Sequence, residues 1–162
     1  MTRRPAMHHM QAPNVGAFGA SPMVNVDSTN PYSDSMSLKV FIVEDSGLIL
    51  RGLIDTLQEM LPLQVVGCAG DEEGACQWLD RSGQDIDLMI VDIFLKQGTG
   101  LNVLKHAAER GLAARKVVLT NYATADIRAR CMALKADRVF DKSAELDELI
   151  DYCGSLAPTG EP

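Results

Sequence analysis

The sequence lacks long hydrophobic runs, holds few aromatic residues, and carries fewer basic than acidic residues. Every apolar run stays well below the roughly 20 residues that a membrane-spanning helix needs, so we expect no association with a membrane. Lysine and arginine together number 15 against 22 aspartates and glutamates, which leaves a formal charge of −7. Direct binding of nucleic acid is disfavoured, because it needs a basic surface that neutralises phosphates.

Cysteine is also scarce, and its spacing matches no common metal or disulfide pattern. Four cysteines are present, none of them in a Cys-x-x-Cys pair, and no histidine lies near one in the sequence. A zinc site or a disulfide framework is therefore not expected. We expect small, buried or half-buried side chains in a reducing cytoplasm instead. The cysteines are Cys68, Cys76, Cys131 and Cys153.

The residues that are present divide the chain into three parts. Residues 1–37 contain several prolines and no sustained apolar period, so they cannot bury enough surface to offset the entropy of ordering. We predict a disordered tail there, a folded domain over residues 38–157, and a short polar tail over residues 158–162. Arg3 and Arg4 are not followed by an apolar segment, which argues against a secretory signal.

Two features of the N-terminal tail leave alternatives open. The run Met7-His8-His9-Met10 has the residue types of a soft-metal site, although a solvated tail accounts for it as well. Met36 directly precedes the first strand pattern, which suggests the hypothesis that translation of the native protein starts there. An intact mass of the native protein that matches the full chain would rule this hypothesis out.

From Leu38 onward, apolar strand-like runs alternate five times with amphipathic helical patterns. Ser46, Asp71, Thr124 and Ser143 stand where N-caps of helices are expected. Short connections between alternating strands and helices require a parallel sheet that is covered on both faces. We therefore predict an α/β, doubly wound (βα)5 fold of the flavodoxin-like, three-layer type with a five-stranded parallel sheet. The predicted strands cover residues 38–43, 64–68, 88–91, 116–119 and 137–140.

The helical patterns also predict the third helix and the inward-facing side chains of the last helix. In the third helix Leu101, Leu104 and Ala108 recur at helical spacing, and Gly111 ends the helix. The last helix is expected to begin after Ser143. Its inward-facing side chains are predicted to be Leu146, Leu149, Ile150 and Cys153.

One stretch of the chain concentrates the candidate chemistry. A short apolar run over residues 88–91 ends in Asp92, and a run of this length predicts a strand buried on both faces. Gly98 and Gly100 then form a loop before a helix restarts at Leu101. Ligands bind at the carboxyl ends of strands in open α/β sheets, so Asp92 is predicted to be a reactive or ligand-binding carboxylate.

Parallel strands bring their carboxyl ends to the same edge of the sheet. The residues that follow the first, third, fourth and fifth strands are Glu44, Asp45, Asp92, Thr120 and Lys142. Carboxylates about 4 Å apart repel by about 1 kcal/mol in water and about 4 kcal/mol at an intermediate effective dielectric, so the gathered acids predict a bound cation. Oxygen ligands favour a hard ion, Mg²⁺ by preference. A hydroxyl donor and a flexible ammonium beside such an ion suit phosphoryl transfer to Asp92.

These motifs resemble the receiver domain of two-component response regulators over residues 38–157, which is essentially the whole predicted folded part. Four pieces in the family's order carry the resemblance. They are Val43-Glu44-Asp45-Ser46, Val91-Asp92 with Gly98-Thr99-Gly100-Leu101, Val117-Val118-Leu119-Thr120, and Phe140-Asp141-Lys142.

The resemblance implies a role for each site residue. Asp92 resembles the phospho-acceptor of the family. Thr120 and Lys142 resemble the residues that contact the phosphoryl group. The metal ligands that the resemblance implies are Glu44, Asp45, Asp92 and the backbone carbonyl of Phe94.

The resemblance also implies partners. Receivers take the phosphoryl group from a phosphohistidine of a sensor histidine kinase or a histidine phosphotransfer protein. They then change the surface formed by the fourth helix, the fifth strand and the fifth helix. Because no output domain follows, we expect a single-domain response regulator that is not an enzyme and signals through contacts with an unidentified protein. The fourth and fifth helices are a candidate docking or homodimer face, with a plain solvated face as the alternative, and its residues are Arg128, Arg130, Lys135, Asp147, Glu148, Asp151 and Tyr152.

Three positions depart from the family pattern. Ser143 replaces the proline that often follows the lysine, so a cis peptide bond is not expected there. The switch aromatic of the family usually lies three residues before the lysine, where this chain has Val139, and the aromatic residue is Phe140 instead. The sequence therefore does not predict a rotating ring linked to Thr120. Phe94 is bulky and flanks the acceptor together with Asn121, which suggests that it slows loss of the phosphoryl group.

Two other functions of the same fold fit the sequence less well. A flavodoxin-like FMN binder would need a loop rich in serine, threonine and glycine after the first strand, and Glu44-Asp45 there would repel the phosphate. An aspartate-nucleophile phosphatase resembles an Asp-x-Asp signature, but Phe94 holds the second position. The alternative that stays open is a receiver-fold adaptor that binds a partner without being phosphorylated.

Overall fold

The computed structural model describes residues 37–158, and its central element is one five-stranded sheet with all neighbouring strands parallel. The strand order is β2-β1-β3-β4-β5. The predicted N-terminal tail, except Ser37, and its candidate metal-binding run lie outside the described residues. The strands are β1 (Leu38–Val43), β2 (Leu63–Ala69), β3 (Leu88–Val91), β4 (Arg115–Thr120) and β5 (Arg138–Asp141).

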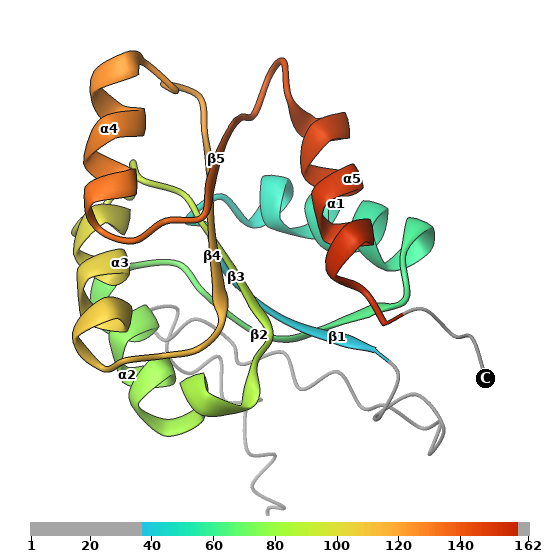
Figure 1. Ribbon diagram of the computed structural model, residues 1–162, viewed down its shortest axis with the longest axis horizontal. Coiled ribbons are helices and arrows are strands. Elements are labelled where there is room, and N and C mark those ends of the chain that lie inside the picture. The colour runs from blue at the N-terminus through green and yellow to red at the C-terminus, as the bar shows by residue number, and fades with distance from the viewer. Residues whose placement is uncertain (1–36, 159–162) are drawn as a thin grey trace, which may run out of the picture.

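Helices cover both faces of this sheet, which completes three layers (Figure 1). Helices α1 and α5 lie on one face, and α2, α3 and α4 lie on the other. The predicted doubly wound (βα)5 fold is confirmed. The helices are α1 (Gly47–Met60), α2 (Glu72–Ser82), α3 (Gly100–Glu109), α4 (Ala125–Ala133) and α5 (Leu146–Leu156), with a short 3₁₀ turn, η1 (Gly83–Asp85), between α2 and β3.

The sheet separates two hydrophobic clusters, and strand β3 contributes to both. Its four residues are all buried. Met89 and Val91 point into the cluster beneath α2, α3 and α4, whereas Leu88 and Ile90 point into the cluster beneath α1 and α5. Burial of each such side chain contributes roughly 1.5–3 kcal/mol, so the middle strand is firmly held and its carboxyl end has a well-defined position.

The strand register places the carboxyl ends of the strands close together at one edge of the sheet. Val43 of β1 pairs with Val91 of β3, so the acids that follow these two residues emerge side by side. At the other side of β3, Thr120 of β4 pairs with Asp141 of β5, directly before Lys142. The parallel register alone therefore assembles residues from four distant segments.

The predicted third helix is confirmed as α3, but its most deeply buried residues are not all those whose spacing indicated it. The buried residues are Gly100, Val103, Leu104 and Ala107, whereas Leu101 and Ala108 are only half-buried. The cause lies at the start of the helix. A Cβ at Gly100 would lie 2.1 Å from the carbonyl oxygen of Asp92. Glycine lets the helix begin directly against the end of β3, which turns positions 100, 103 and 107 inward.

The start of α5 also differs from the prediction, because Ser143 does not cap this helix. Its backbone N–H and its hydroxyl both donate to the carboxylate of Asp141, at 2.8 Å and 2.6 Å. This turn delays the helix, which begins at Leu146 with Glu145 in the N-cap position. Leu146, predicted to face inward, is 36% exposed as a result. Leu149 and Cys153 are buried as predicted.

The three other predicted N-caps within the described residues are confirmed. Ser46, Asp71 and Thr124 each accept a backbone N–H at the start of their helices. Cys68, Cys131 and Cys153 are buried, and Cys76 is half-buried. Residues 37–158 contain no cis peptide bond. None of the helices within these residues has the length and apolar character needed to cross a membrane.

Candidate functional site

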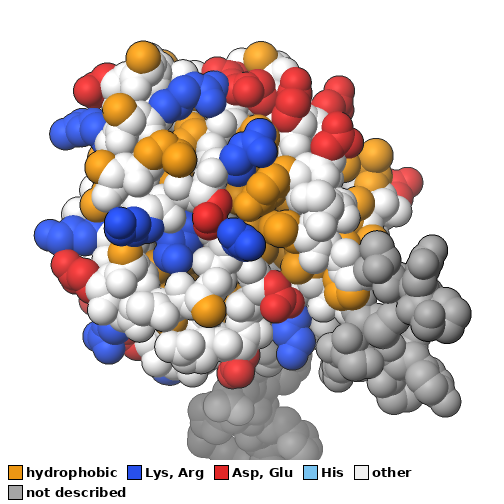
Figure 2. Space-filling model, viewed as in Figure 1, with side chains coloured by type: hydrophobic (Ala, Val, Ile, Leu, Met, Phe, Trp, Pro, Cys, Tyr) orange, Lys and Arg blue, Asp and Glu red, His pale blue; other side chains and the backbone are white. Residues whose placement is uncertain are grey.

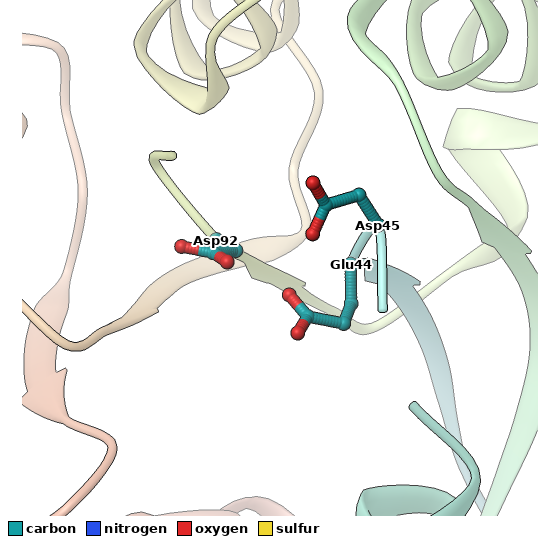
Figure 3. Close-up of side chains that lie close together, drawn as sticks. All are labelled: Glu44, Asp45 and Asp92. Carbon is teal, nitrogen blue, oxygen red and sulfur yellow. The ribbon is translucent and has the colours of Figure 1, made fainter. Parts of the chain in front are cut away.

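Three carboxylates meet at the carboxyl edge of the sheet. Glu44 and Asp45 follow β1, Asp92 follows β3, and each offers an oxygen that lies within 4.8 Å of those of the other two. Figure 3 shows the three side chains gathered around one space. Glu44 and Asp92 are buried, and Asp45 is half-buried. The sequence prediction that these acids converge is confirmed.

Lys142 follows the edge strand β5, and its side chain reaches the carboxylates from there. Its Nζ donates to Oδ2 of Asp92 at 2.8 Å and to both carboxylate oxygens of Glu44 at 3.0 Å and 3.1 Å. Its backbone N–H donates to the carbonyl oxygen of Thr120 at 2.9 Å, which holds the start of the β5–α5 loop against β4. The side chain is only 11% exposed, so its ammonium is largely withdrawn from water.

The charges in this cluster perturb one another. Burial, together with the neighbouring Asp92, raises the pKa of Glu44 to about 7, although Lys142 opposes the rise. Burial by itself would lower the pKa of the Lys142 ammonium, but its hydrogen bonds to Asp92 and Glu44 raise it above its ordinary value. Lys142 is therefore charged at neutral pH, and Glu44 exchanges its proton in the same range.

The loop that follows Asp92 is tied to the carboxylates through its backbone. The N–H of Phe94 donates to Oδ1 of Asp92 at 3.1 Å, and the N–H of Lys96 donates to Oδ2 of Asp45 at 2.8 Å. Both oxygens of Asp92 are thus engaged, one by the loop and the other by Lys142. The carbonyl of Phe94 as a metal ligand stays a prediction.

Thr120 occupies the predicted place at the end of β4 and is fully buried. Its hydroxyl oxygen accepts the backbone N–H of Tyr122 at 3.2 Å. The ring of Tyr122 meets that of Phe94 edge-on, with 5.0 Å between ring centroids and 74° between planes. Tyr122 was missed at the sequence level. The sequence could have indicated Tyr122, because Tyr122 follows Thr120 by two residues just as Phe94 follows Asp92 by two residues.

The donor set fits a divalent cation of the hard class. Three carboxylates offer oxygen atoms alone, at separations that a single small ion can bridge. The same carboxylates would otherwise repel one another, and Lys142 neutralises only part of their charge. The arrangement can therefore hold a hard cation beside a buried carboxylate and an ammonium.

One residue of the candidate docking face on α4 and α5 also makes contacts within the fold. Arg128 is half-buried and donates to the carbonyl oxygens of Ala123 and Val139 and to the carboxylate of Glu145. Arg130 and Lys135 are exposed, as expected. Figure 2 shows basic side chains over α4 and acidic side chains gathered where α5 begins. The two helices thus carry opposite charge.

Comparison with known proteins agrees with this geometry. The model of the response regulator receiver domain matches residues 40–153. The transcriptional regulatory protein YvfU of Bacillus subtilis is 27% identical over 114 residues, which are 70% of this chain and 56% of that protein. A protein-glutamate methylesterase/protein-glutamine glutaminase of Paramagnetospirillum magneticum is 30% identical over 140 residues, which are 81% of this chain and 35% of that protein. Across the four curated relatives, the chain spans between 35% and 56% of their length.

Solved structures show the same fold at low sequence identity. A DNA-binding response regulator of the LuxR family from Staphylococcus aureus superposes with a TM-score of 0.67 and 15% identity, over 74% of this chain and 98% of that one. The response regulator domain of Thermotoga maritima CheB superposes with a TM-score of 0.64 and 20% identity, over 75% of this chain and 99% of that one. At this identity the likeness concerns the fold.

Proposed function

Because the chain belongs to the response regulator receiver family, we propose that it accepts a phosphoryl group on Asp92, with Mg²⁺ held by Glu44, Asp45 and Asp92. One observation carries the proposal. Nζ of Lys142 lies 2.8 Å from Oδ2 of Asp92, inside a cluster of three carboxylates at the carboxyl edge of the sheet. A phosphoryl group attached to Asp92 would be within reach of this ammonium. The backbone carbonyl of Phe94 is proposed as a further metal ligand.

The reaction is a transfer between two nucleophiles. A carboxylate oxygen of Asp92 forms a bond to phosphorus while the bond from phosphorus to the donor's histidine nitrogen breaks, and the imidazole leaves and takes up a proton. The product is a mixed anhydride on Asp92. When bound, the metal ion would supply positive charge to the phosphoryl oxygens.

The chain's own residues provide the rest of the electrostatic stabilisation. Lys142 places a positive charge 2.8 Å from Asp92, where it would offset the negative charge of a phosphoryl group attached there. Thr120, buried at the end of β4, is proposed to donate its hydroxyl proton to a phosphoryl oxygen. The backbone carbonyl oxygen of Thr120 accepts the N–H of Lys142, so a shift of Thr120 would also shift Lys142.

The partners follow from the donor chemistry. The proposed donor is a sensor histidine kinase or a histidine phosphotransfer protein. The proposed output is a protein contact through α4, β5 and α5, with a homodimer through α4 and α5 as one form of it. The stand-alone, non-enzymatic role and the cytoplasmic location expected from the sequence stay predictions.

Intact mass spectrometry tests the proposal directly. The protein is incubated with acetyl phosphate and Mg²⁺, beside Asp92→Asn and beside a sample with chelator. We expect a single phosphoryl adduct in the unsubstituted protein and none in the other two samples. No adduct on a protein that is folded by circular dichroism would favour the unphosphorylated adaptor instead, and the roles given to Thr120 and Lys142 would be withdrawn.

A further inference from the structure

Glu72, the first residue of α2, reaches across to the loop that follows the phospho-acceptor. Its Oε2 accepts the backbone N–H of Thr99 at 2.9 Å and the side-chain amide of Asn102 at 3.3 Å. Its own backbone N–H donates to the carbonyl oxygen of Gln97 at 3.3 Å. Glu72 thus contacts the loop on both sides of Gly98, at Gln97 and at Thr99, although Thr99 lies 27 positions away in the sequence.

The loop backbone lies directly against this side chain. Gly98 has φ +79°, and a Cβ at this position would lie 2.3 Å from Cβ of Glu72 and 2.4 Å from its Oε2. Only glycine tolerates both the positive φ and this close approach. The fit between Gly98 and Glu72 therefore defines where the loop tip lies relative to α2.

The other side of the same loop is bound by the metal-site carboxylates. Lys96 donates its N–H to Asp45, and Phe94 donates its N–H to Asp92. The loop is consequently held between two anchors, the half-buried Glu72 on one side and the acidic cluster on the other. Neither Asp45 nor Asp92 contacts α2 through these bonds, so Glu72 acts on the site through the loop.

We propose that Glu72 is a positioning residue for the metal and phosphoryl site: it fixes the loop over residues 93–99 against Asp45 and Asp92, and thereby sets the affinity for Mg²⁺ and the rate of phosphoryl acceptance. The second half of this proposal rests on the proposed function. Loss of the Glu72 carboxylate leaves the N–H of Thr99 without its acceptor and frees the loop to shift away from Asp45. Groups that orient metal ligands from the next layer typically change metal affinity by about 10–100-fold.

The chain offers a matched control in the next residue. Glu73 lies in the same first turn of α2 and has the same charge, but it is exposed and contacts Gln77 of its own helix. Both glutamates lie in the first turn, where the helix dipole favours a negative charge. A difference between Glu72→Ala and Glu73→Ala therefore reports the loop contact and not the stability of α2. Glu72→Gln retains one oxygen acceptor and serves as the conservative variant.

The first measurement needs no metal. Amide hydrogen exchange of the segment 93–101 is followed in chelator for the unsubstituted protein and the three variants. We expect faster exchange of this segment in Glu72→Ala, near-normal exchange in Glu73→Ala, and an intermediate rate in Glu72→Gln. Equal exchange in Glu72→Ala and Glu73→Ala would overturn the positioning role.

The second measurement addresses the site. Isothermal titration with Mg²⁺ and the rate of adduct formation from acetyl phosphate are compared among the same proteins. We expect about tenfold weaker Mg²⁺ binding and correspondingly slower acceptance in Glu72→Ala, recovered in part in Glu72→Gln. Values within twofold for Glu72→Ala and Glu73→Ala would refute the link to the site. If the unsubstituted protein neither binds Mg²⁺ nor forms an adduct, the proposed function fails, and the exchange result alone decides whether Glu72 positions the loop.

Discussion

The guanidinium of Arg128 and the carboxylate of Glu145 form an ion pair that connects α4 to the loop carrying Lys142. Arg128 also donates to the carbonyl oxygen of Ala123 at 3.0 Å and to that of Val139 at 2.8 Å. Glu145 in turn accepts the N–H of Asp141 at 3.1 Å. The segments after Thr120 and around Lys142 are thus linked through one side chain, which also holds the backbone of Val139, the position where the family's switch aromatic is expected.

Replacement of Arg128 is expected to weaken this connection. Arg128→Ala removes the hydrogen bonds to Ala123 and Val139, which should lower the free energy of unfolding by at least about 1 kcal/mol. It should also raise the pKa of Glu145 toward its ordinary value, because the hydrogen bond to Arg128 holds that pKa down. Arg130→Ala, on the exposed side of the same helix, is the control. Chemical denaturation of both variants measures the difference, and equal stability would mean that the Arg128 contacts contribute nothing.

Lys142→Ala should destabilise the metal-free protein and make it unusually responsive to Mg²⁺. Without the ammonium, Glu44 and Asp92 are left as buried, unpaired carboxylates, and loss of one partner from a buried pair typically costs about 3–5 kcal/mol. A divalent cation relieves this repulsion. Thermal unfolding in chelator and in Mg²⁺ should therefore show a larger stabilisation by Mg²⁺ in Lys142→Ala than in the unsubstituted protein. An identical response in the two proteins would contradict this account of the lysine.

Affinity for Mg²⁺ should rise between pH 6 and pH 8. The pKa of Glu44 is raised to about 7, so the carboxyl is largely protonated at the lower pH and must lose its proton to bind the ion. The same shift makes the metal-free protein lose stability as pH rises from about 4.5 to about 7, because the folded state holds the proton more tightly than the unfolded chain. Titrations at three pH values measure the first effect. In Glu44→Gln, Mg²⁺ affinity and stability should both depend less on pH. An unchanged pH dependence would show that another group causes it.

The contact between Phe94 and Tyr122 should slow loss of the phosphoryl group. These rings are 48% and 62% exposed, and they meet beside the segments that carry Asp92 and Thr120. An edge-to-face pair is worth about 0.5–1.5 kcal/mol, so its removal should accelerate hydrolysis by about 2–10-fold if water must enter between the rings. Phe94→Ala and Tyr122→Ala should have similar, non-additive effects on the decay of the adduct. Met60→Ala, which shortens an exposed apolar side chain at the end of α1, should leave the decay of the adduct unchanged. An unchanged decay in Phe94→Ala would refute the prediction.

Two glycine-to-alanine variants should have effects of opposite sign. At Gly100 the added Cβ would lie 2.1 Å from the carbonyl oxygen of Asp92, so the helix must move and about 1–3 kcal/mol of stability should be lost. At Gly52, in the middle of α1, nothing lies within 4 Å of the added Cβ, and about 0.5–1 kcal/mol should be gained. Denaturant midpoints measure both. A stable Gly100→Ala protein would show that α3 is free to shift away from the site.

The chemistry-bearing residues were predictable because local rules decide where each strand ends. The apolar run before Asp92 has the length of one buried strand, and the acids after Val43 follow another. Parallel strands deliver such residues to the same edge whatever the details of packing. The convergence of Glu44, Asp45, Asp92 and Lys142 could therefore be expected without coordinates, and hydrogen bonds and carboxylate separations confirm it.

The sequence analysis missed hydrogen bonds of two kinds, one within a local turn and one between separate elements. Ser143 was predicted to cap α5, but Asp141 takes both its N–H and its hydroxyl, because β5 ends close enough to form a tight turn. Arg128 was predicted only as part of a candidate docking face, and its hydrogen bonds to two carbonyl oxygens and a carboxylate of other segments were not expected. Propensity and periodicity contain no information on such long-range partners.

The sequence by itself determined the alternation of strands and helices, the parallel sheet, and the edge at which the acids and the lysine meet, because these follow from short-range patterns along the chain. The tertiary structure alone decided how Glu72 meets the loop at Gly98, how Phe94 meets Tyr122, and how Arg128 connects to Glu145. Each of these contacts joins segments far apart along the chain, and it forms only once the sheet has set the distance between them.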